Sequence, residues 1–525
     1  MPISDILSTL QYTTGLIKTW GQSRLPNGST LAEALTLNDI PFWDAFAVDL
    51  ARIYMPVALT SNSDISQIIR PYLTRAKHTL RAFAHKRSTH GCSTWPIGPT
   101  ILCLDFSEHI SRDVLQPIAT RLAAHPDCRV VSLSDKSWKK ANQDLCPSGL
   151  YQTVWEHWNQ QVCRQISHLK QEVRLTKINL RASNYISSIV RDDDQCMRSY
   201  LEHVLNLFFR VFLPFFIPQA IVARHILESH RPALIISPDV ADPRTRIYTL
   251  LCRQMGIPCM EVQFGPIGGE GIEIEWQFLT ADKVAVWGKT SKEAMLKHGI
   301  PEEKIIITGS PRHDCLVNVP EAAAKEMRAK LGVPEKSAMV LLASAYQLKT
   351  YNEYSNPEIL RSMKRAVFEA ANTPGIFLVV KPHPLESVRE TRALSGKNKN
   401  IIFVSQKSDI RELTKICDAF VSFGSTATAD ALIAGKPVIC PVFPGWIWSE
   451  LFTNTGTTLV PTSAAEVLKV FRLVANGTHE GVRAKLEPAR QNFLAHWVYR
   501  ADGLATERVA KVALQMAQIN IGTAH

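Results

Sequence analysis

The 525-residue chain has no disulfide framework, no CxxC pair and no signal-peptide pattern. Its 11 cysteines are scattered singly, and such an odd set fits a reducing cytosol better than an oxidising compartment. Met1–Leu25 lacks a basic start followed by an apolar run. The most apolar stretch, Leu205–Ala223, carries Arg210 and two prolines, which favours a buried helix–turn–helix over a membrane span. We therefore expect a cytoplasmic protein, with peripheral contact at the inner face of the membrane as an alternative.

Metal-binding and nucleic-acid-binding patterns are also missing. No DxD motif lies between apolar strands, and Asp192-Asp193-Asp194 falls in a polar helical stretch that is typical of a solvated face. Zinc-finger spacing and the basic–aromatic pattern of nucleic-acid-binding sheets are absent. The net charge of +11 instead favours small anionic partners such as nucleotide phosphates, or anionic lipid heads. We expect no metal, no cofactor and no nucleic acid.

What the sequence does contain is a long alternation of apolar runs and helical patterns. Residues 1–95 are expected to form a helical extension, whose basic run between Arg75 and Arg87 is a solvated helix face or, alternatively, a membrane-docking surface. From Thr100 onward, short apolar runs alternate with helical segments, as in parallel α/β sheets. A helical insertion is expected around 150–230, and a second α/β run starts near Ser337.

The sequence thus predicts an α/β protein with two Rossmann-like domains that face a cleft, and an N-terminal helical extension. The expected parts are the extension (1–95), the N-terminal Rossmann-like acceptor domain with its insertion (96–315), the C-terminal donor domain (316–480) and closing helices that pack back on the N-terminal half (481–525).

Two loops follow predicted strands of the C-terminal half, where ligands of parallel sheets bind. After Ile376–Val380 comes Lys381-Pro382-His383-Pro384, in which the prolines fix the backbone and the lysine and histidine offer positive charge and a hydrogen-bond donor. After Ala419–Ser422 comes Phe423-Gly424-Ser425-Thr426, a loop of small residues at a predicted helix N-terminus. We expect the donor-binding residues Lys381, His383, Pro384, Gly424, Ser425 and Thr426 to hold the phosphate of a nucleotide.

These segments resemble the donor half of bacterial surface and capsular polysaccharide glycosyltransferases of the GT-B type. Related patterns occur in Kdo transferases, bacterial sialyltransferases and CDP-glycerol glycerophosphotransferases. The segments Gln263-Phe264-Gly265, Val286-Trp287-Gly288 and Ile307–Asp314 are similar to the same group, over roughly residues 230–450. A typical relative has Gln-His-Gly where this chain has Gln263-Phe264-Gly265, so an imidazole is missing here.

The catalytic base of such an enzyme is expected in the N-terminal domain. The loop after the first strand ranks first, with Asp105, Glu108 and His109. The glycine-rich loop that leads to Glu270, Glu273 and Glu275 ranks second, and Asp239 with Asp242 ranks third. Gln263, Gly265, Glu270 and Arg312 are further cleft candidates, while His313 and Asp314 are interpreted as hinge or N-cap residues.

The resemblance implies an inverting, metal-independent glycosyltransferase that uses a nucleotide sugar and a glycan or lipid-linked glycan acceptor. A CMP-activated acidic sugar such as Kdo or a nonulosonic acid is favoured, and its carboxylate would need basic partners, for which Arg244, Arg246 and Arg312 are candidates. The alternatives are a UDP-sugar transferase, a UDP-GlcNAc 2-epimerase-like isomerase, a CDP-polyol phosphotransferase and a non-catalytic scaffold of polysaccharide assembly.

Overall fold

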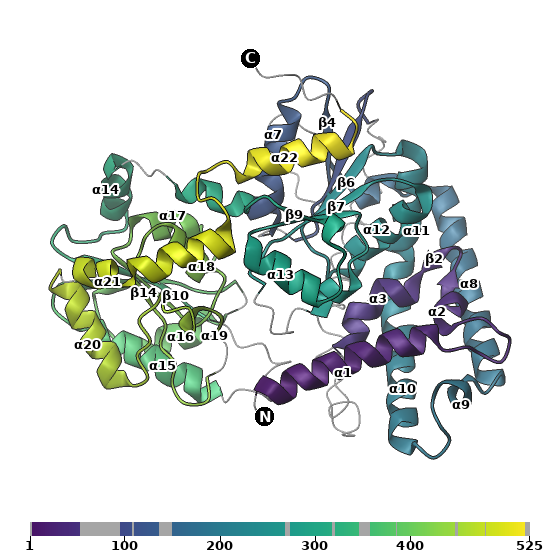
Figure 1. Ribbon diagram of the computed structural model, residues 1–525, viewed down its shortest axis with the longest axis horizontal. Coiled ribbons are helices and arrows are strands. Elements are labelled where there is room, and N and C mark those ends of the chain that lie inside the picture. The colour runs from purple at the N-terminus through teal and green to yellow at the C-terminus, as the bar shows by residue number, and fades with distance from the viewer. Residues whose placement is uncertain are drawn as a thin grey trace. The chain divides into compact units, whose positions relative to one another are not determined.

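The computed structural model divides the chain into two compact units, each built around its own parallel sheet (Figure 1). It describes residues 3–52, 95–107, 110–135, 150–267, 274–317, 321–345, 357–384, 386–446, 450–477 and 479–519. The N-terminal unit comprises Ser4–Val286, Lys292–Arg312 and Thr506–His525. The C-terminal unit comprises Trp287–Ser291 and His313–Ala505, together with Met1–Ile3.

The N-terminal unit contains a seven-stranded parallel sheet in the order β5-β4-β3-β6-β7-β8-β9. The chain starts this sheet at β3, adds β4 and β5 on one side and then returns to the other side with β6. The strand order therefore reverses between β3 and β6. The bounds are β3 Thr100–Leu104, β4 Arg129–Ser134, β5 Leu150–Thr153, β6 Leu234–Ser237, β7 Cys259–Val262, β8 Lys283–Val286 and β9 Ile305–Ile307.

One face of this sheet is covered by α7 (Gln116–Ala123), the π-helical turn before it (Ser111–Leu115) and α22 (Ala505–Met516). Ile101 and Ile236 from the strands pack in this layer with Val509 of α22. On the other side, α12 (Pro243–Met255) packs against α11 and α3. The remaining bounds are α1 Ile3–Gln22, α2 Leu31–Ala34, β1 Thr36–Leu37, β2 Ile40–Pro41, α3 Phe42–Ala51, α8 Gln160–Ala182, α9 Tyr185–Ile189 and α13 Lys289–Lys297.

The apolar stretch around Leu205–Ala223 is helical throughout, so the predicted helix–turn–helix is wrong in its turn. α10 (Gln195–Leu207), a π-helical segment (Phe208–Phe212) and α11 (Leu213–His230) follow one another without a break. The wider π-helical turn lies just before Pro214. In a regular α-helix the ring of this proline would clash with the carbonyl group four residues before it. Among the described residues, this is the one helical stretch long and apolar enough to cross a membrane, and 67% of its most apolar window is buried inside the protein, as in a core helix.

The C-terminal unit contains a five-stranded parallel sheet in the order β12-β11-β10-β13-β14. Its first strand, β10, lies in the middle, with β11 on one side and β13 on the other. The order again reverses at the first strand. The bounds are β10 Ala338–Ala343, β11 Ile376–Lys381, β12 Ile401–Phe403, β13 Ala419–Ser422 and β14 Val438–Ile439.

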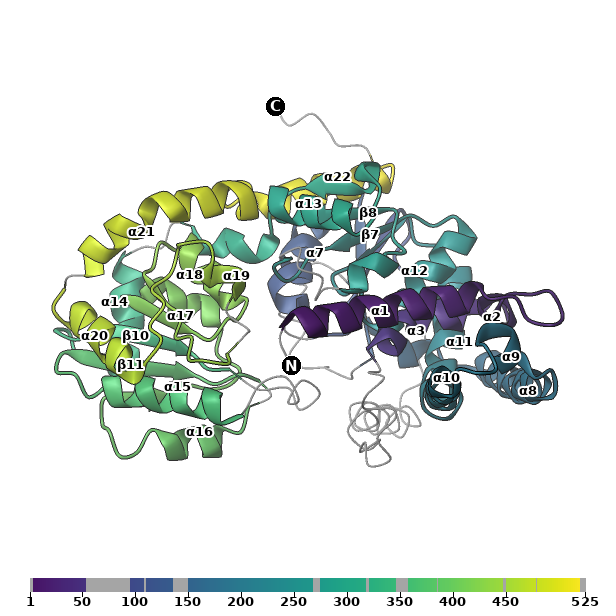
Figure 2. The same cartoon turned by 60° about the horizontal axis from the view of Figure 1, so that its bottom comes forward.

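Helices cover both faces of this second sheet (Figure 2). Val340 and Leu342 of β10 pack with α15 and α20 on one face, whereas Met339 and Leu341 pack with α17, α18 and Phe493 on the other. This alternation along one strand is the pleat of a fully buried strand. The bounds are α14 Glu321–Lys330, α15 Pro357–Ala370, α16 Val388–Leu394, α17 Ile410–Ile416, α18 Ala427–Ile433, α19 Glu450–Thr453, α20 Ala464–Ala475 and α21 His479–Phe493.

The predicted α/β class with parallel sheets is confirmed. Two details of the expected organisation differ. β5 (Leu150–Thr153) is an edge strand inside the stretch that we expected to be helical. The closing segment also begins later than residue 481, because α21 belongs to the C-terminal unit and only α22 packs in the N-terminal core. The basic run between Arg75 and Arg87 lies outside the described residues.

Candidate functional site

The two loops expected to bind phosphate leave strands on either side of β10. Lys381 is the last residue of β11, and Ser422 is the last residue of β13. Both strands pair with β10 in parallel register, so both loops emerge at the same edge of the sheet. Neighbouring strands lie about 4.8 Å apart, which places the two loops about 10 Å from each other. This is the point where the strand order reverses, and open α/β sheets bind their ligands there.

The loop Lys381–Pro384 presents its histidine and lysine at partly exposed positions. Pro382 is buried and Pro384 is exposed, so the chain turns outward within this loop. The backbone of Ser344, which directly follows β10, donates a hydrogen bond of 3.1 Å to the carbonyl of Lys381 and ties the loop to the central strand. His383 therefore lies on a fixed turn at the carboxyl edge of the sheet.

The buried carboxylate of Glu386 holds the backbone of this loop in place by hydrogen bonds. Its Oε2 accepts a hydrogen bond of 3.0 Å from the backbone nitrogen of His383. Its Oε1 accepts a hydrogen bond of 2.8 Å from Ser344 Oγ, and it also accepts from Lys364 Nζ and Thr391 Oγ1. The Lys364 and Glu386 side chains are 7% and 4% exposed, so this is a buried ion pair. Burial lowers the pKa of Lys364, and the nearby Glu386 opposes that shift.

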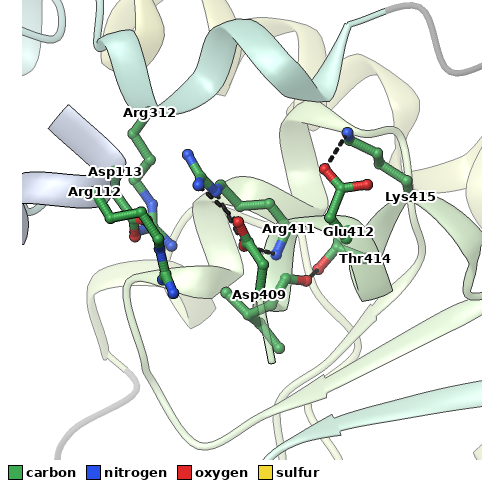
Figure 3. A network of polar contacts seen from close by, with 9 residues as sticks. Arg112, Asp113, Arg312, Asp409, Arg411, Glu412, Thr414 and Lys415 are labelled. Atoms are coloured by element: carbon green, nitrogen blue, oxygen red, sulfur yellow. Dashed lines mark hydrogen bonds and ion pairs between the residues drawn. The ribbon is translucent and has the colours of Figure 1, made fainter. Parts of the chain in front are cut away.

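Gln406, in the segment after β12, also holds this loop in place. Its Nε2 donates hydrogen bonds to the carbonyl oxygens of His383 at 2.8 Å, Pro384 at 3.3 Å and Glu386 at 3.0 Å. Neither Glu386 nor Gln406 was predicted from the sequence. The one available signal was a carboxylate three residues after His383, a spacing that also suits an ordinary turn. At the carboxyl end of β12, Arg411 is paired with Asp409, the N-cap of α17 (Figure 3).

The serine loop is organised by Ser422, which is fully buried. Its Oγ accepts hydrogen bonds from the backbone nitrogens of Gly424 at 3.2 Å and Ser425 at 3.1 Å, and from Thr428 Oγ1 at 2.8 Å. Gly424 has a φ of 97°, a conformation that suits glycine. Fewer backbone amides are therefore left to bind a phosphate than we predicted. Two of them, those of Gly424 and Ser425, already donate to Ser422 Oγ, and α18 has only 7 residues. Ser425 and Thr426 remain partly exposed, with their hydroxyl groups at the sheet edge.

His313 is the first residue of the C-terminal unit after the boundary at Arg312, and it lies in the core of that unit. It is 3% exposed, packs edge-to-face on Trp287 with ring centroids 4.5 Å apart, and places Nε2 3.8 Å from Asp430 Oδ1 of α18. Asp314 Oδ1 accepts a hydrogen bond of 2.9 Å from the backbone nitrogen of Ala505. Both residues fasten segments of the C-terminal unit.

The candidate bases of the N-terminal unit are described only in part. Glu108, His109, Glu270 and Glu273 lie outside the described residues. Asp105 follows β3 as expected, at a partly exposed position, and its backbone nitrogen donates a hydrogen bond of 2.8 Å to the carbonyl of Leu133.

Asp239 follows β6, next to the reversal point of the N-terminal sheet, and its surroundings are the most acidic of the described candidates. Burial, and then the charge of Asp242, raise the pKa of Asp239 to about 7, with Glu275 adding to the effect and Arg244 opposing it. Glu261 at the end of β7 is fully buried, and burial followed by the charge of Asp239 raises its pKa well above the ordinary value. Asp239 is intermediate in exposure, and its Oδ1 accepts a hydrogen bond of 3.2 Å from the backbone nitrogen of Ala241. A carboxylate with a pKa near neutrality is suited to proton transfer.

The other acidic candidates have structural partners. Asp242 caps α12 and is paired with Arg244, which also pairs with Asp135. Glu275 Oε2 lies 3.0 Å from Arg52 Nη2. Asp239, whose loop was ranked third from the sequence, is the described candidate with the raised pKa and without an ion-pair partner of its own, and Asp105 stays an alternative.

The three arginines expected to hold the carboxylate of an acidic sugar already have hydrogen-bond or ion-pair partners within the N-terminal unit. Arg244 is 5% exposed and ion-paired, and Arg246 donates to the carbonyl oxygens of Asp44, Val240 and Phe278. Arg312 pairs with Asp113, whose other carboxylate oxygen lies 2.9 Å from Arg112 Nε (Figure 3). An arginine that already neutralises an aspartate offers little to a further carboxylate.

The remaining cleft candidates form a local turn. Gln263 is fully buried, and its Nε2 donates a hydrogen bond of 2.7 Å to the carbonyl of Gly265. This bond stabilises the backbone after β7 and leaves the amide side chain little freedom to bind a ligand. Among the described residues, no group of three or more His, Cys, Asp or Glu side chains is arranged to hold a metal ion.

Comparisons with known proteins give a family for the second half of the chain and a fold for most of it. Residues 275–514, somewhat less than half of the chain, match the family described as CDP-Glycerol:Poly(glycerophosphate) glycerophosphotransferase. The S. aureus protein MnaA, solved with UDP, is 13% identical, with a TM-score of 0.52 over 81% of this chain and 99% of that one. A UDP-N-acetylglucosamine 2-epimerase is 11% identical, with a TM-score of 0.50 over 82% and 98%. A comparison with curated protein sequences gave no match.

At such low identities the structural likeness shows the fold alone. The chain therefore has the α/β fold of UDP-N-acetylglucosamine 2-epimerase, and its second half is similar to the glycerophosphotransferase family.

Proposed function

We propose that this protein is a transferase that moves a group from a nucleotide-activated donor to a hydroxyl group of a glycan or lipid-linked glycan. The observation that carries the proposal is the pair of loops at the reversal point of the C-terminal sheet. Lys381 and His383 lie on one side of β10, and Ser425 and Thr426 lie on the other. A cation, an imidazole and two hydroxyl groups at one sheet edge are suited to a phosphate.

The chemistry assigned to these residues is stabilisation of the leaving nucleotide. When the acceptor oxygen attacks, the bond to the nucleotide phosphate breaks and that phosphate gains negative charge. Lys381 supplies positive charge, and the His383 ring and the Ser425 hydroxyl donate hydrogen bonds to its oxygens. Because Glu386 and Gln406 hold the backbone of His383, the donors need little rearrangement during the reaction.

The acceptor hydroxyl loses its proton when the new bond forms, and this step needs a base. Asp239 is the described carboxylate best suited to that role, because its pKa of about 7 permits both proton uptake and release near neutrality. Asp105, with Glu108 and His109, is the alternative base from the sequence analysis.

The donor is proposed to be a CDP-activated alcohol, and the acceptor oxygen then attacks the phosphorus that carries the alcohol while CMP leaves. Two observations support this choice over a CMP-activated acidic sugar. The second half of the chain is similar to glycerophosphotransferases. The three arginines expected to hold a sugar carboxylate have aspartate or carbonyl partners instead.

A second candidate is an isomerase that acts on a UDP-sugar without an acceptor. It is favoured by the fold shared with UDP-N-acetylglucosamine 2-epimerase and by the acidic group of Asp239, Glu261 and Glu275, since proton removal from carbon also needs a carboxylate. The two candidates differ in one respect that is simple to measure, namely whether turnover requires an acceptor.

The first experiment is a thermal-shift series with CMP, CDP, UDP and GDP. A ligand of the native state raises the melting temperature by mass action. We expect the cytidine nucleotides to give the largest shift, and His383→Ala to abolish it. His168→Ala, which removes an exposed imidazole of α8, serves as the matched control and should leave the shift intact. The proposal fails if none of the nucleotides binds, or if the two variants behave alike.

The second experiment separates the reactions with labelled CDP-glycerol, CMP-Kdo and UDP-GlcNAc. Release of CMP from CDP-glycerol only when an acceptor is present supports the proposal. Release from CMP-Kdo would restore the acidic-sugar donor, and acceptor-free conversion of UDP-GlcNAc would establish the isomerase. Nucleotide binding without any turnover would indicate a scaffold.

A further inference from the structure

Helix α8 of the N-terminal unit carries a basic stripe that the proposed reaction does not use. Lys170, Arg174, Lys177 and Arg181 are spaced by four, three and four residues, so they lie along one side of the helix. Glu172 is the one acidic residue of α8, and it accepts a hydrogen bond of 3.1 Å from the backbone nitrogen of Asn38. Along α8 the four cations of the stripe thus outnumber the single carboxylate.

Arg210, from the π-helical segment after α10, extends this basic surface. Lys177 Nζ lies over the ring of Phe209, 5.6 Å from its centroid. Burial lowers the pKa of Lys177, and the positive charges of Arg181 and Arg210 lower it further. Glu202 of the neighbouring helix α10 is an acidic residue in the same region. Burial raises the pKa of the Tyr185 hydroxyl, the charge of Glu202 raises it further, and the charge of Arg181 lowers it.

Two large apolar side chains are exposed on the same helix. Leu175 and Ile178 are each 53% exposed, although a soluble helix usually places such residues inside. They lie one turn apart on the exposed side of α8, with Ile178 next to the basic stripe and Leu175 farther round the helix. Val162, Ile166, Leu169 and Leu180 form the buried face. α8 packs on α11 and lies along the outside of its unit in both ribbon views (Figures 1 and 2).

A row of cations next to exposed apolar side chains is the pattern of helices that lie in a membrane interface. The cations attract acidic headgroups, and the apolar residues enter the boundary of the acyl chains. We propose that this surface of α8, formed by Lys170, Arg174, Leu175, Ile178 and Arg181 with Arg210, docks the protein on an anionic phospholipid bilayer. The proposal is independent of the donor and the reaction, because it concerns only where the protein is held.

The occupant is a bilayer and not a nucleic acid because of Leu175 and Ile178. A phosphate backbone would engage the cations but would leave these two apolar side chains in water. Docking on a bilayer accounts for both features of the surface at once.

The test is flotation of the full chain with vesicles of pure phosphatidylcholine or of phosphatidylcholine mixed with phosphatidylglycerol. Binding is expected only to the mixed vesicles, and it should weaken as salt rises above about 0.1 M, where the Debye length is about 10 Å. The combined variant Lys170→Gln, Arg174→Gln and Arg181→Gln should lower partitioning by about 100-fold, since each cation near an anionic surface contributes about fivefold. Leu175→Ser with Ile178→Ser should lower binding while keeping its salt dependence.

A matched control removes three exposed cations of the C-terminal unit, with Arg389→Gln, Lys397→Gln and Lys399→Gln. These substitutions have the same effect on net charge and should leave vesicle binding unchanged. The proposal is overturned if the wild-type chain ignores mixed vesicles, or if the control loses as much binding as the α8 variant. It is also overturned if an RNA duplex, and not the vesicles, binds in a manner that depends on α8.

Discussion

Replacing Asp239 by asparagine should make the protein more stable at high pH and should stop its turnover. Asparagine has nearly the same shape as aspartate but carries no charge, so it reproduces the protonated carboxyl group. In the native structure burial and Asp242 raise the pKa of Asp239 from 3.8 to about 7. The native state thus holds a proton that the unfolded chain releases at lower pH.

The sign follows from linkage. Between about pH 4 and pH 7 the native state binds more protons than the unfolded state, so the unfolding free energy of the wild type falls as the pH rises. The asparagine side chain would not titrate, so this loss would disappear in the variant. A pKa difference of one corresponds to about 1.4 kcal/mol, so the rise from 3.8 to about 7 sets an upper bound of about 4 kcal/mol on this loss of stability. The bound is reached above the native pKa.

Urea unfolding of the wild type and of Asp239→Asn at about pH 5 and about pH 8 measures this difference. The variant should gain stability relative to the wild type on going to the higher pH, whereas Asp193→Asn, which alters an exposed carboxylate, should not. Equal pH dependence in all three proteins would refute the reasoning. If the variant is stabilised and yet retains full turnover, Asp239 is not the base.

Four further outcomes are expected. His383→Ala and Ser425→Ala should each lower kcat by about 100- to 1000-fold with the melting temperature preserved, because each removes one donor to the leaving phosphate; wild-type rates in steady-state assays would contradict this role. Turnover should persist in EDTA, and loss that Mg²⁺ restores would contradict the metal-independent mechanism. Glu386→Gln should destabilise the fold by about 3 kcal/mol in urea unfolding, because it leaves the ammonium group of Lys364 buried without its counter-charge; an unchanged midpoint would argue against a buried pair. Gly288→Ala should lower the melting temperature, because an added Cβ would lie 2.5 Å from the carbonyl oxygen of His496; an unaltered melting curve would show that this contact relaxes freely.

The strands could be predicted because most of them are short apolar runs, buried on both faces, between helical patterns. Ile376–Lys381 and Ala419–Ser422 are of this kind. β5 was missed because Leu150–Thr153 contains Gln152 and Tyr151 and lies at the sheet edge, where continuous apolar character is not required. Pro218 suggested a turn, but packing of the long apolar helix outweighs the loss of one backbone hydrogen bond.

The position of the two loops that are expected to bind phosphate followed from the sequence. Which charged side chains are paired with one another did not. A loop after a parallel strand lies at the carboxyl edge whatever its neighbours are. Whether Arg244 is available to a ligand depends on Asp135, which is more than a hundred positions away along the chain. The support that Glu386 and Gln406 give to His383 likewise depends on strands that pair only in the folded protein.

The return of α22 to the N-terminal core bears on how the chain is made. Because Val509, Ala513 and Leu514 belong to that core, the N-terminal unit is interrupted in sequence by the C-terminal unit. During synthesis from the N-terminus, α7 can cover part of one face of the sheet that starts at Thr100, but the rest of that face must wait for residues beyond 505. The C-terminal unit does not have to wait for a distant segment in this way, because almost all of it lies in the single stretch His313–Ala505. On the ribosome, therefore, the part of the chain that is made second should be the first to reach its native packing, and the part that is made first should remain a substrate for chaperones for longer.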